Sequence, residues 1–264
     1  MTVYPQIRTS ADLLKSTIRL EELIPFLHQQ KAKSCAIVNT KLYGLLPFWF
    51  EMKRAGIHPV IGLTIQLEWT EEQSLPLVLY AKTNEGYQNL LKISSSIAIR
   101  SDQTIPLRWL LAYGKGIVFM IPALDLQGRW LQQTAENTLL EIKNAYSNEL
   151  YIGISRGSNE GPFERQAVEF AVKNGLPIVA THESLFLKLN EAVGSNKKES
   201  YVLTAEQWQG KFQDEPQWLL QMESLLMSCQ VQLTTNDVYM PRFPLQKRDT
   251  AGNILQQQVV AGLQ

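Results

Sequence analysis

Residues 149–181, ELYIGISRGSNEGPFERQAVEFAVKNGLPIVAT, decide the fold class of this chain. The stretch opens with an apolar run at Glu149–Ser155 and closes with another at Pro177–Thr181, and both have the length of buried strands. Between them, apolar residues recur at helical spacing from residue 163 to 171, and Gly175 is a typical helix-ending residue. A strand, a helix and a strand in this order predict a β-α-β unit with parallel strands.

The same rhythm extends toward the amino terminus. Five further β-rich runs precede this unit: Val3–Thr9, Ser34–Asn39, His58–Leu67, Leu75–Lys82 and Gly116–Pro122. Several of them are unbroken apolar runs rather than alternations, which is typical of strands covered on both faces. Strands that alternate with helical patterns predict an α/β fold with a mostly parallel sheet, either open or closed into a barrel.

Beyond Thr181 this rhythm stops. Residues 184–230 read as mainly helical, with a polar loop at residues 195–200 and an apolar stripe between residues 218 and 226. We therefore expect a βα barrel at residues 1–195 and a helical extension at residues 196–264. Met240–Pro244 and the glutamine-rich tail to Gln264 are expected to mark a truncation inside a longer chain.

Composition excludes several classes of protein. The 264 residues contain 25 Lys+Arg and 25 Asp+Glu, so a neutral chain has no overall field for nucleic acid or an anionic membrane. Its longest apolar runs are far shorter than the roughly 20 residues that cross a bilayer. Cys35 and Cys229, each in an apolar stretch, are expected to be free buried thiols. The sequence carries no export signal, and the cytoplasm is the expected location.

The residues alone offer little catalytic chemistry. The three histidines, His28, His58 and His182, lack the close spacing from which most histidine metal sites are built, and no Cys-x-x-Cys compensates. Gly153-Ile-Ser155-Arg-Gly157 matches a nucleophile-elbow pattern, with His182 as a possible base. A glycine-rich stretch separates Ser155 from the next helix, which favours a loop over a serine hydrolase, although that alternative stays open.

Several phrases together resemble one known family. They are Leu13-Leu14, Leu20–Leu23, Leu42–Gly44, Ala55–Gly62, Leu79–Leu91 and Gly175–Thr181. They are similar to the amino-terminal PHP domain of bacterial DNA polymerase III alpha subunits, in the type found in low-GC Gram-positive bacteria. The resemblance covers nearly the whole chain and implies a distorted (β/α)7 barrel, the PHP fold, with a helical C-terminal extension. Met240–Pro244 resembles the join to the polymerase core.

The resemblance also implies where a metal site would lie, and the expected ligands are replaced. Active family members bind up to three divalent metals at the strand ends and hydrolyse phosphoesters. The opening His-x-His is Gln6-Ile7-Arg8, and an Asp-His pair is Val38-Asn39 or, with a shift of one residue, Asn39-Thr40. The remaining departures are Thr64 for a glutamate, Gly153 for a carboxylate, and Glu183-Ser184-Leu185 for an Asp-x-His. We therefore predict a vestigial site without catalytic residues, metal ligands or cofactor.

A guanidinium in such a place needs a partner, because an unpaired buried charge is costly. We predict that Arg8 pairs with Glu183, with a solvent-facing Arg8 as the alternative. The expected function is a non-catalytic module of a DNA-directed DNA polymerase, contacting the remainder of the alpha chain and replisome subunits, and DNA only through the full polymerase. The alternatives are a metal-dependent phosphoesterase or pyrophosphatase, and direct DNA binding by this chain.

Overall fold

The computed structural model describes residues 2–69, 74–122, 135–157, 161–192, 199–234, 244–245 and 250–263. The chain divides into a compact unit at Met1–Val231 and a small second unit at Gln232–Gln264. Most of the predicted polar loop at 195–200 and residues 240–243 of the predicted join lie outside the described residues.

The core of the compact unit is one curled sheet. Its strands are β1 (Thr2–Ile7), β2 (Ala32–Ile37), β3 (His58–Glu68), β4 (Ser74–Ala81), β5 (Ile117–Pro122), β6 (Leu150–Ile154), β7 (Ile178–Ala180) and β8 (Glu183–Ser184). They lie in the order β7-β6-β5-β4-β3-β2-β1-β8. All seven predicted strands are present, and the two-residue β8 is an addition. Only Thr181 and His182 separate the two edge strands along the chain, so the sheet curls back on itself as a distorted barrel.

The predicted parallel sheet holds everywhere except at β4. This strand runs antiparallel to both β3 and β5, whereas the other described neighbours pair in parallel. Only residues 69–73 separate β3 from β4, which is too short a connection for a parallel crossover. The region is therefore a β-hairpin rather than a βα unit.

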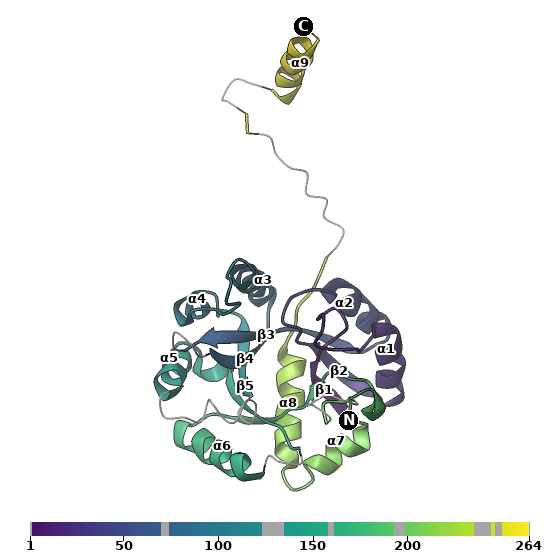
Figure 1. The fold of residues 1–264 in the computed structure, drawn as a ribbon, viewed down its shortest axis with the longest axis vertical. Coiled ribbons are helices and arrows are strands. Elements are labelled where there is room, and N and C mark those ends of the chain that lie inside the picture. The colour runs from purple at the N-terminus through teal and green to yellow at the C-terminus, as the bar shows by residue number, and fades with distance from the viewer. Residues whose placement is uncertain are drawn as a thin grey trace. The chain divides into compact units, whose positions relative to one another are not determined.

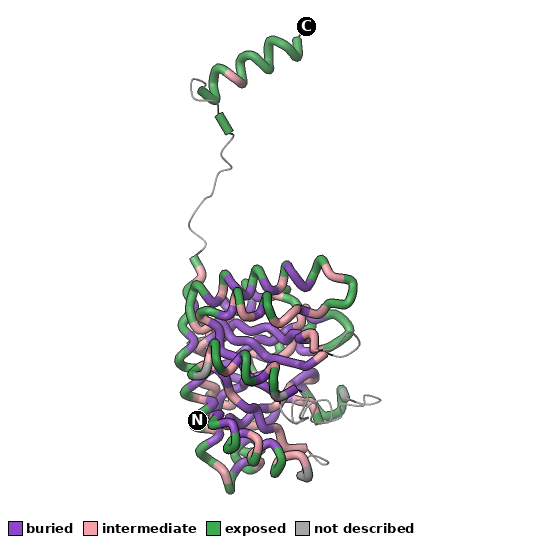
Figure 2. The backbone as a smooth tube through the Cα atoms, turned by 90° about the vertical axis from the view of Figure 1, so that its left-hand side faces the viewer, coloured by how far each residue is buried: buried purple, intermediate pink, exposed green. Residues whose placement is uncertain are grey.

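Helices cover the outer face of the sheet (Figure 1). They are α1 (Leu20–Gln29), α2 (Leu45–Arg54), α3 (Asn84–Ala98), α4 (Leu107–Ala112), α5 (Glu136–Tyr146) and α6 (Gly161–Asn174). Leu23 of α1 and Phe48 of α2, both fully buried, belong to one apolar cluster with Cys35 and Ile37 of β2. Figure 2 shows the result, with buried strands inside and exposed helix surfaces outside.

The concave inner face of the sheet packs against a late helix. In the described part of the compact unit, the α-helices after β8 are α7 (Ala205–Lys211) and α8 (Pro216–Ser228), and Figure 1 shows α8 in the middle of the barrel. Met222, Leu225 and Leu226 of α8 are buried in one cluster with inward side chains from β1 to β7. We expected residues from 196 onward to form an extension, but the compact unit includes α7 and α8.

The end of α8 is fastened at one edge of the barrel. Nε2 of His58, the first residue of β3, lies 2.8 Å from the carbonyl oxygen of Cys229. Gln230 N–H donates to the carbonyl of Lys82 at 2.8 Å, just past the last residue of the antiparallel β4. These contacts place the end of α8 at the amino-terminal edge of the parallel strands. A pocket is found at the opposite edge.

The second unit contains α9 (Ala251–Gly262), none of whose described residues is buried. Its first turn is capped by Thr250, whose side chain accepts a hydrogen bond from the Asn253 N–H. Among the described residues, none of the helices combines the length and the hydropathy that a membrane span requires. Cys35 and Cys229 are free and buried, as predicted.

Candidate functional site

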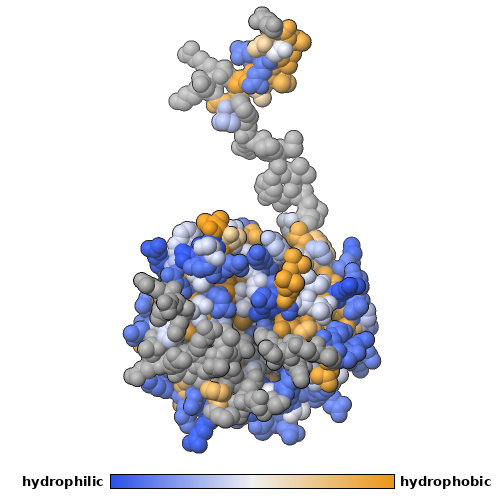
Figure 3. All heavy atoms as spheres, in the orientation of Figure 1, coloured by the Kyte–Doolittle hydropathy of each residue, from blue (hydrophilic) through white to orange (hydrophobic). Residues whose placement is uncertain are grey.

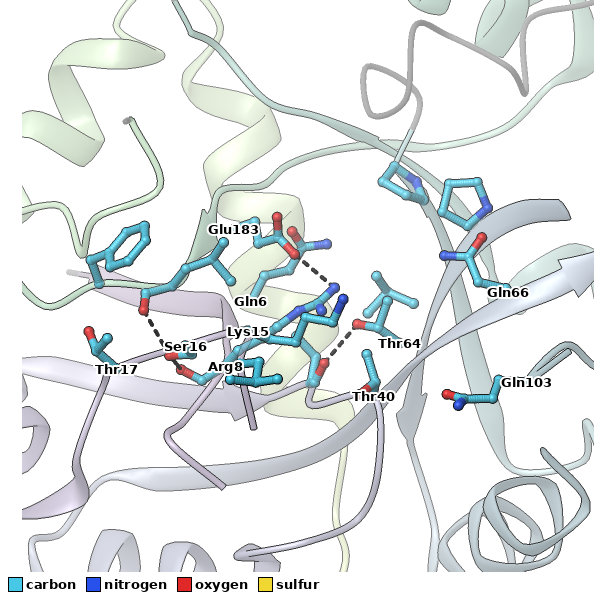
Figure 4. A pocket seen from close by; sticks show the side chains of 17 residues that line it. Gln6, Arg8, Lys15, Ser16, Thr17, Thr40, Thr64, Gln66, Gln103 and Glu183 are labelled. Atoms are coloured by element: carbon cyan, nitrogen blue, oxygen red, sulfur yellow. Dashed lines mark hydrogen bonds and ion pairs between the residues drawn. The ribbon is translucent and has the colours of Figure 1, made fainter. Parts of the chain in front are cut away.

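A pocket of about 780 Å³ opens where β1, β2, β5 and β8 end (Figure 4). Its described lining consists of Gln6, Arg8, Leu14, Lys15, Ser16, Thr17, Val38, Thr40, Thr64, Gln66, Pro76, Val78, Gln103, Pro122, Glu183, Leu185 and Phe186. Six of the eight predicted site positions are among them. Asn39 and Gly153 are not.

Arg8 is the central charged residue of the pocket. Its backbone N–H donates to the carbonyl of Ser184 at 3.0 Å, which fixes the end of β1 beside β8. Its Nη2 lies 2.8 Å from Oε1 of Glu183, and both side chains are only 13% exposed. The predicted ion pair is therefore confirmed, and the alternative of a solvent-facing Arg8 is wrong.

Asp12 is a second carboxylate beside Arg8, and the sequence analysis missed it. Its Oδ2 lies 3.6 Å from Nη1 of Arg8, and its side chain is 5% exposed. Both carboxylate oxygens also accept hydrogen bonds from Thr40, one from the backbone N–H at 2.9 Å and one from the hydroxyl at 2.5 Å. Arg8 thus stands between two carboxylates, and Asp12 joins the loop after β1 to the loop after β2. Its position shortly after a strand end was the available signal.

Asn39 has a structural task next to the pocket. Its Oδ1 accepts a hydrogen bond from the Thr9 N–H at 2.9 Å, and its Nδ2 donates to the Thr9 hydroxyl at 3.0 Å. Nδ2 also donates to the Tyr43 carbonyl at 3.2 Å. Because both ends of this buried amide are bonded to the chain, Asn39 holds two loops together instead of facing a ligand.

Thr64 and Gly153, two further predicted site positions, have roles in hydrogen bonding and in packing between strands. The Thr64 hydroxyl donates to the Val38 carbonyl at 2.7 Å, so it ties β3 to β2 while lining the pocket. A Cβ placed on Gly153 would lie 2.9 Å from Sδ of Met120 and 3.1 Å from Cγ2 of Thr181. A larger residue there would require the Met120 side chain to shift, so close packing against side chains of the neighbouring strands favours the glycine.

His182 lies apart from this pocket. It lines a small separate cavity with Tyr4, Ser184 and Trp208, and its ring meets Trp208 edge-on. Nε2 donates to the Tyr201 carbonyl at 2.8 Å, and burial lowers the pKa of His182 to about 4. This geometry makes His182 a packing residue.

The segment after Ser155 likewise serves packing. Arg156 forms ion pairs with Glu164 in α6 and Asp214 before α8, and its guanidinium lies over the rings of Phe212 and Trp218. These contacts fasten the end of β6 to the α7–α8 region. Because Nε2 of His182 is committed to a carbonyl, the geometry does not favour the serine-hydrolase alternative.

Comparison with known protein families shows which family the chain belongs to. A family described as "PHP domain" matches residues 6–157, which is more than half of the sequence. The chain belongs to the PHP family. The match begins at Gln6, the first predicted site position, and it contains five of the other seven; Glu183 and Leu185 follow it.

Within the PHP family, this chain is similar to polymerase subunits. DNA polymerase III subunit alpha of Bacillus subtilis (strain 168) is 26% identical over 289 residues, covering 99% of this chain and 26% of that protein. The protein of that name from Halalkalibacterium halodurans is 24% identical, covering 96% of this chain and 25% of that protein. The chain thus spans about a quarter of the length of these relatives.

A solved structure supports the PHP fold. An amidohydrolase from Chromobacterium violaceum superposes with a TM-score of 0.51 at 13% identity, covering 70% of this chain and 88% of the other. At that identity the likeness concerns the fold alone.

The side chains at the PHP barrel mouth do not fit a multinuclear metal centre. Divalent metals need carboxylate, imidazole or thiolate ligands. Glu183 is the one acidic side chain in the described lining, and it is paired with a guanidinium. Among the described residues there is no group of three histidine, cysteine or acidic side chains that could hold a metal. We therefore derive no metal-dependent step for this pocket.

Proposed function

We propose that this chain is a non-catalytic PHP domain at the amino end of a DNA polymerase III alpha subunit. The observation that carries the proposal is the position of Arg8, whose guanidinium lies between Glu183 and Asp12 at the strand ends. A fixed cation there repels metal ions and engages the carboxylates nearest to it. The similarity to polymerase subunits along 96–99% of the chain supplies the context.

In this proposal the barrel has a structural role and contacts partners, and it catalyses no reaction. The remainder of the alpha chain is the first partner, replisome subunits are further partners, and DNA is contacted only through the complete polymerase. The balanced charge of 25 basic and 25 acidic residues supports the last point, because phosphate contacts dominate the affinity for nucleic acid. Nucleotide addition then belongs to other parts of the polymerase.

The first experiment measures metal and hydrolysis on the purified 264-residue chain. We expect substoichiometric Zn, Mn and Fe by mass spectrometry after purification without chelator. We also expect no release of phosphate or nitrophenol from pyrophosphate or bis(p-nitrophenyl) phosphate with Mn²⁺ or Zn²⁺ added. A metal-dependent PHP phosphoesterase assayed in parallel shows that the assay works. Stoichiometric metal, or hydrolysis that a chelator abolishes, favours the enzyme alternative and refutes the proposal.

A second experiment tests the architectural role in the complete polymerase. Arg8→Met is expected to lower the thermal midpoint of the polymerase while leaving kcat for nucleotide addition by the folded enzyme unchanged. Arg165→Met is the control, because Arg165 is 85% exposed and pairs with Glu169 on the surface of α6. If kcat of Arg8→Met falls at a temperature where both variants are fully folded, the proposal of a purely structural PHP domain is contradicted.

A further inference from the structure

The pocket at the barrel mouth contains hydrogen-bonding capacity that the fold does not use. Gln6 of β1 is only 4% exposed, and it lines the pocket. Its side-chain amide makes no hydrogen bond with any described residue. The amide atoms of Gln6 are not among the buried unpartnered atoms, so they face the open pocket, where both the oxygen and the NH2 group can bond a ligand.

Lys15 brings a cation to the same place. It belongs to the loop after β1, it lines the pocket, and it forms no ion pair with a described residue. Figure 4 shows the side chains of Gln6, Arg8 and Lys15 converging with Glu183 in the middle of the pocket. Arg8 pairs with Glu183 and Asp12 through its two Nη atoms, and its Nε has no partner among the described residues. Lys15 is therefore the lining cation that no described carboxylate engages.

The rest of the lining limits the ligand's charge and shape. Arg8 is engaged by the carboxylates of Glu183 and Asp12, so the Lys15 ammonium is the charge that an anionic ligand would meet. A phosphate monoester carries nearly two charges at pH 7 and would bring the second one toward Glu183. Seven apolar residues also line the pocket: Leu14, Val38, Pro76, Val78, Pro122, Leu185 and Phe186. They favour a ligand with an apolar body.

The outer face drawn in Figure 3 shows no comparable feature among its coloured residues. The face drawn in Figure 3 is mostly hydrophilic, and its apolar side chains form small separate groups. We therefore propose that the mouth pocket binds a monocarboxylate with an apolar body, whose carboxylate accepts hydrogen bonds from the Lys15 ammonium and the Gln6 amide. The inference rests on the pocket alone and holds whether or not the chain belongs to a polymerase.

The test uses hexanoate as the probe and hexanamide, its neutral isostere, as the matched ligand control. Titration of the ¹⁵N-labelled chain is followed by NMR, and the side-chain amide signals of Gln6 are assigned by their loss in Gln6→Leu. We expect these signals to shift with hexanoate and to stay in place with hexanamide. Lys15→Met is expected to weaken hexanoate binding about tenfold, the loss typical of one charge-assisted contact.

Lys41→Met is the matched protein control, because Lys41 lies in the neighbouring loop after β2 and does not line the pocket. We expect it to leave the hexanoate affinity unchanged, which separates a local contact from a change in net charge. The proposal is overturned by equal affinities for hexanoate and hexanamide, by equal losses in the two lysine variants, or by no shift of the Gln6 amide. Stronger binding of inorganic phosphate than of hexanoate at the same signals also overturns it.

Discussion

Arg8, Glu183 and Asp12 form an ion cluster whose members depend on one another. Arg8→Met removes the guanidinium that the two carboxylates share, and these carboxylates are 13% and 5% exposed. Breaking a buried pair costs several kcal/mol, and the partial exposure reduces this to about 2 kcal/mol. Urea unfolding at pH 7 measures the change. Arg8→Lys, which keeps the charge, is expected to lose less than Arg8→Met, and equal losses would contradict the electrostatic explanation.

His182 makes stability depend on pH. Burial lowers its pKa from 6.5 to about 4 in the folded chain, so below pH 6.5 the unfolded chain takes up a proton that the folded chain does not. His182 therefore contributes full stability above about pH 6.5, and the contribution falls as the pH drops toward 4, by at most about 3 kcal/mol. The check is urea unfolding of wild type and His182→Gln at pH 7 and pH 4.5. Their difference should shrink at the lower pH, whereas exposed His28→Gln should follow wild type.

Single residues also show what the sequence could reveal about the site. The pairing of Arg8 with Glu183 was predictable, because a buried charge needs a counter-charge. The role of Asn39 was not, since its bonds to Thr9 depend on how two loops meet across the sheet. Asp12 follows the end of a strand, which was a signal, but its bonds to Thr40 likewise depend on how two loops meet. The contacts that Gly153 makes with Met120 and Thr181 depend on the register of neighbouring strands.

At the level of elements, apolar periodicity revealed all seven main strands but not their directions. Alternation and burial are the same for a parallel and an antiparallel strand, so β4 was placed in a parallel sheet. The length of the β3–β4 connection carried the missing information, because a dozen or more residues are needed for a parallel crossover. The apolar stripe of α8 was predicted, but its position inside the barrel could not be read from a helical pattern.

The stripe of α8 predicts a large effect at one methionine. Met222 is fully buried in the cluster that joins α8 to the inner face of the sheet. Met222→Ala removes most of this side chain and leaves a cavity, so we expect a loss of about 3 kcal/mol in the free energy of unfolding. Leu220→Ala on the same helix, 66% exposed, is expected to change stability by less than about 0.5 kcal/mol. Similar losses in both variants would show that α8 does not fill the barrel.

For the whole molecule, the end of the folded barrel is placed at residue 195 by the sequence and at Val231 by the compact unit. The two positions make opposite predictions about which shortened chain folds. A chain ending at residue 195 lacks α8 and therefore exposes the inner side chains of β1 to β7 that pack against it. A chain ending at Val231 keeps the whole compact unit and loses only a part whose helix, α9, has no buried residue. We therefore predict that the barrel needs residues well beyond 195 in order to fold.

We expect the 1–231 chain to unfold in urea cooperatively and within about 0.5 kcal/mol of the 264-residue chain, because the deleted helix buries nothing. The 1–195 chain is expected to lack a cooperative transition and to bind a hydrophobic dye such as ANS, since its inner apolar face is uncovered. Near-ultraviolet circular dichroism separates the two states independently. A cooperative transition in the 1–195 chain would show that the βα barrel holds together without α8, and that α8 is an addition to a finished barrel rather than its inner core.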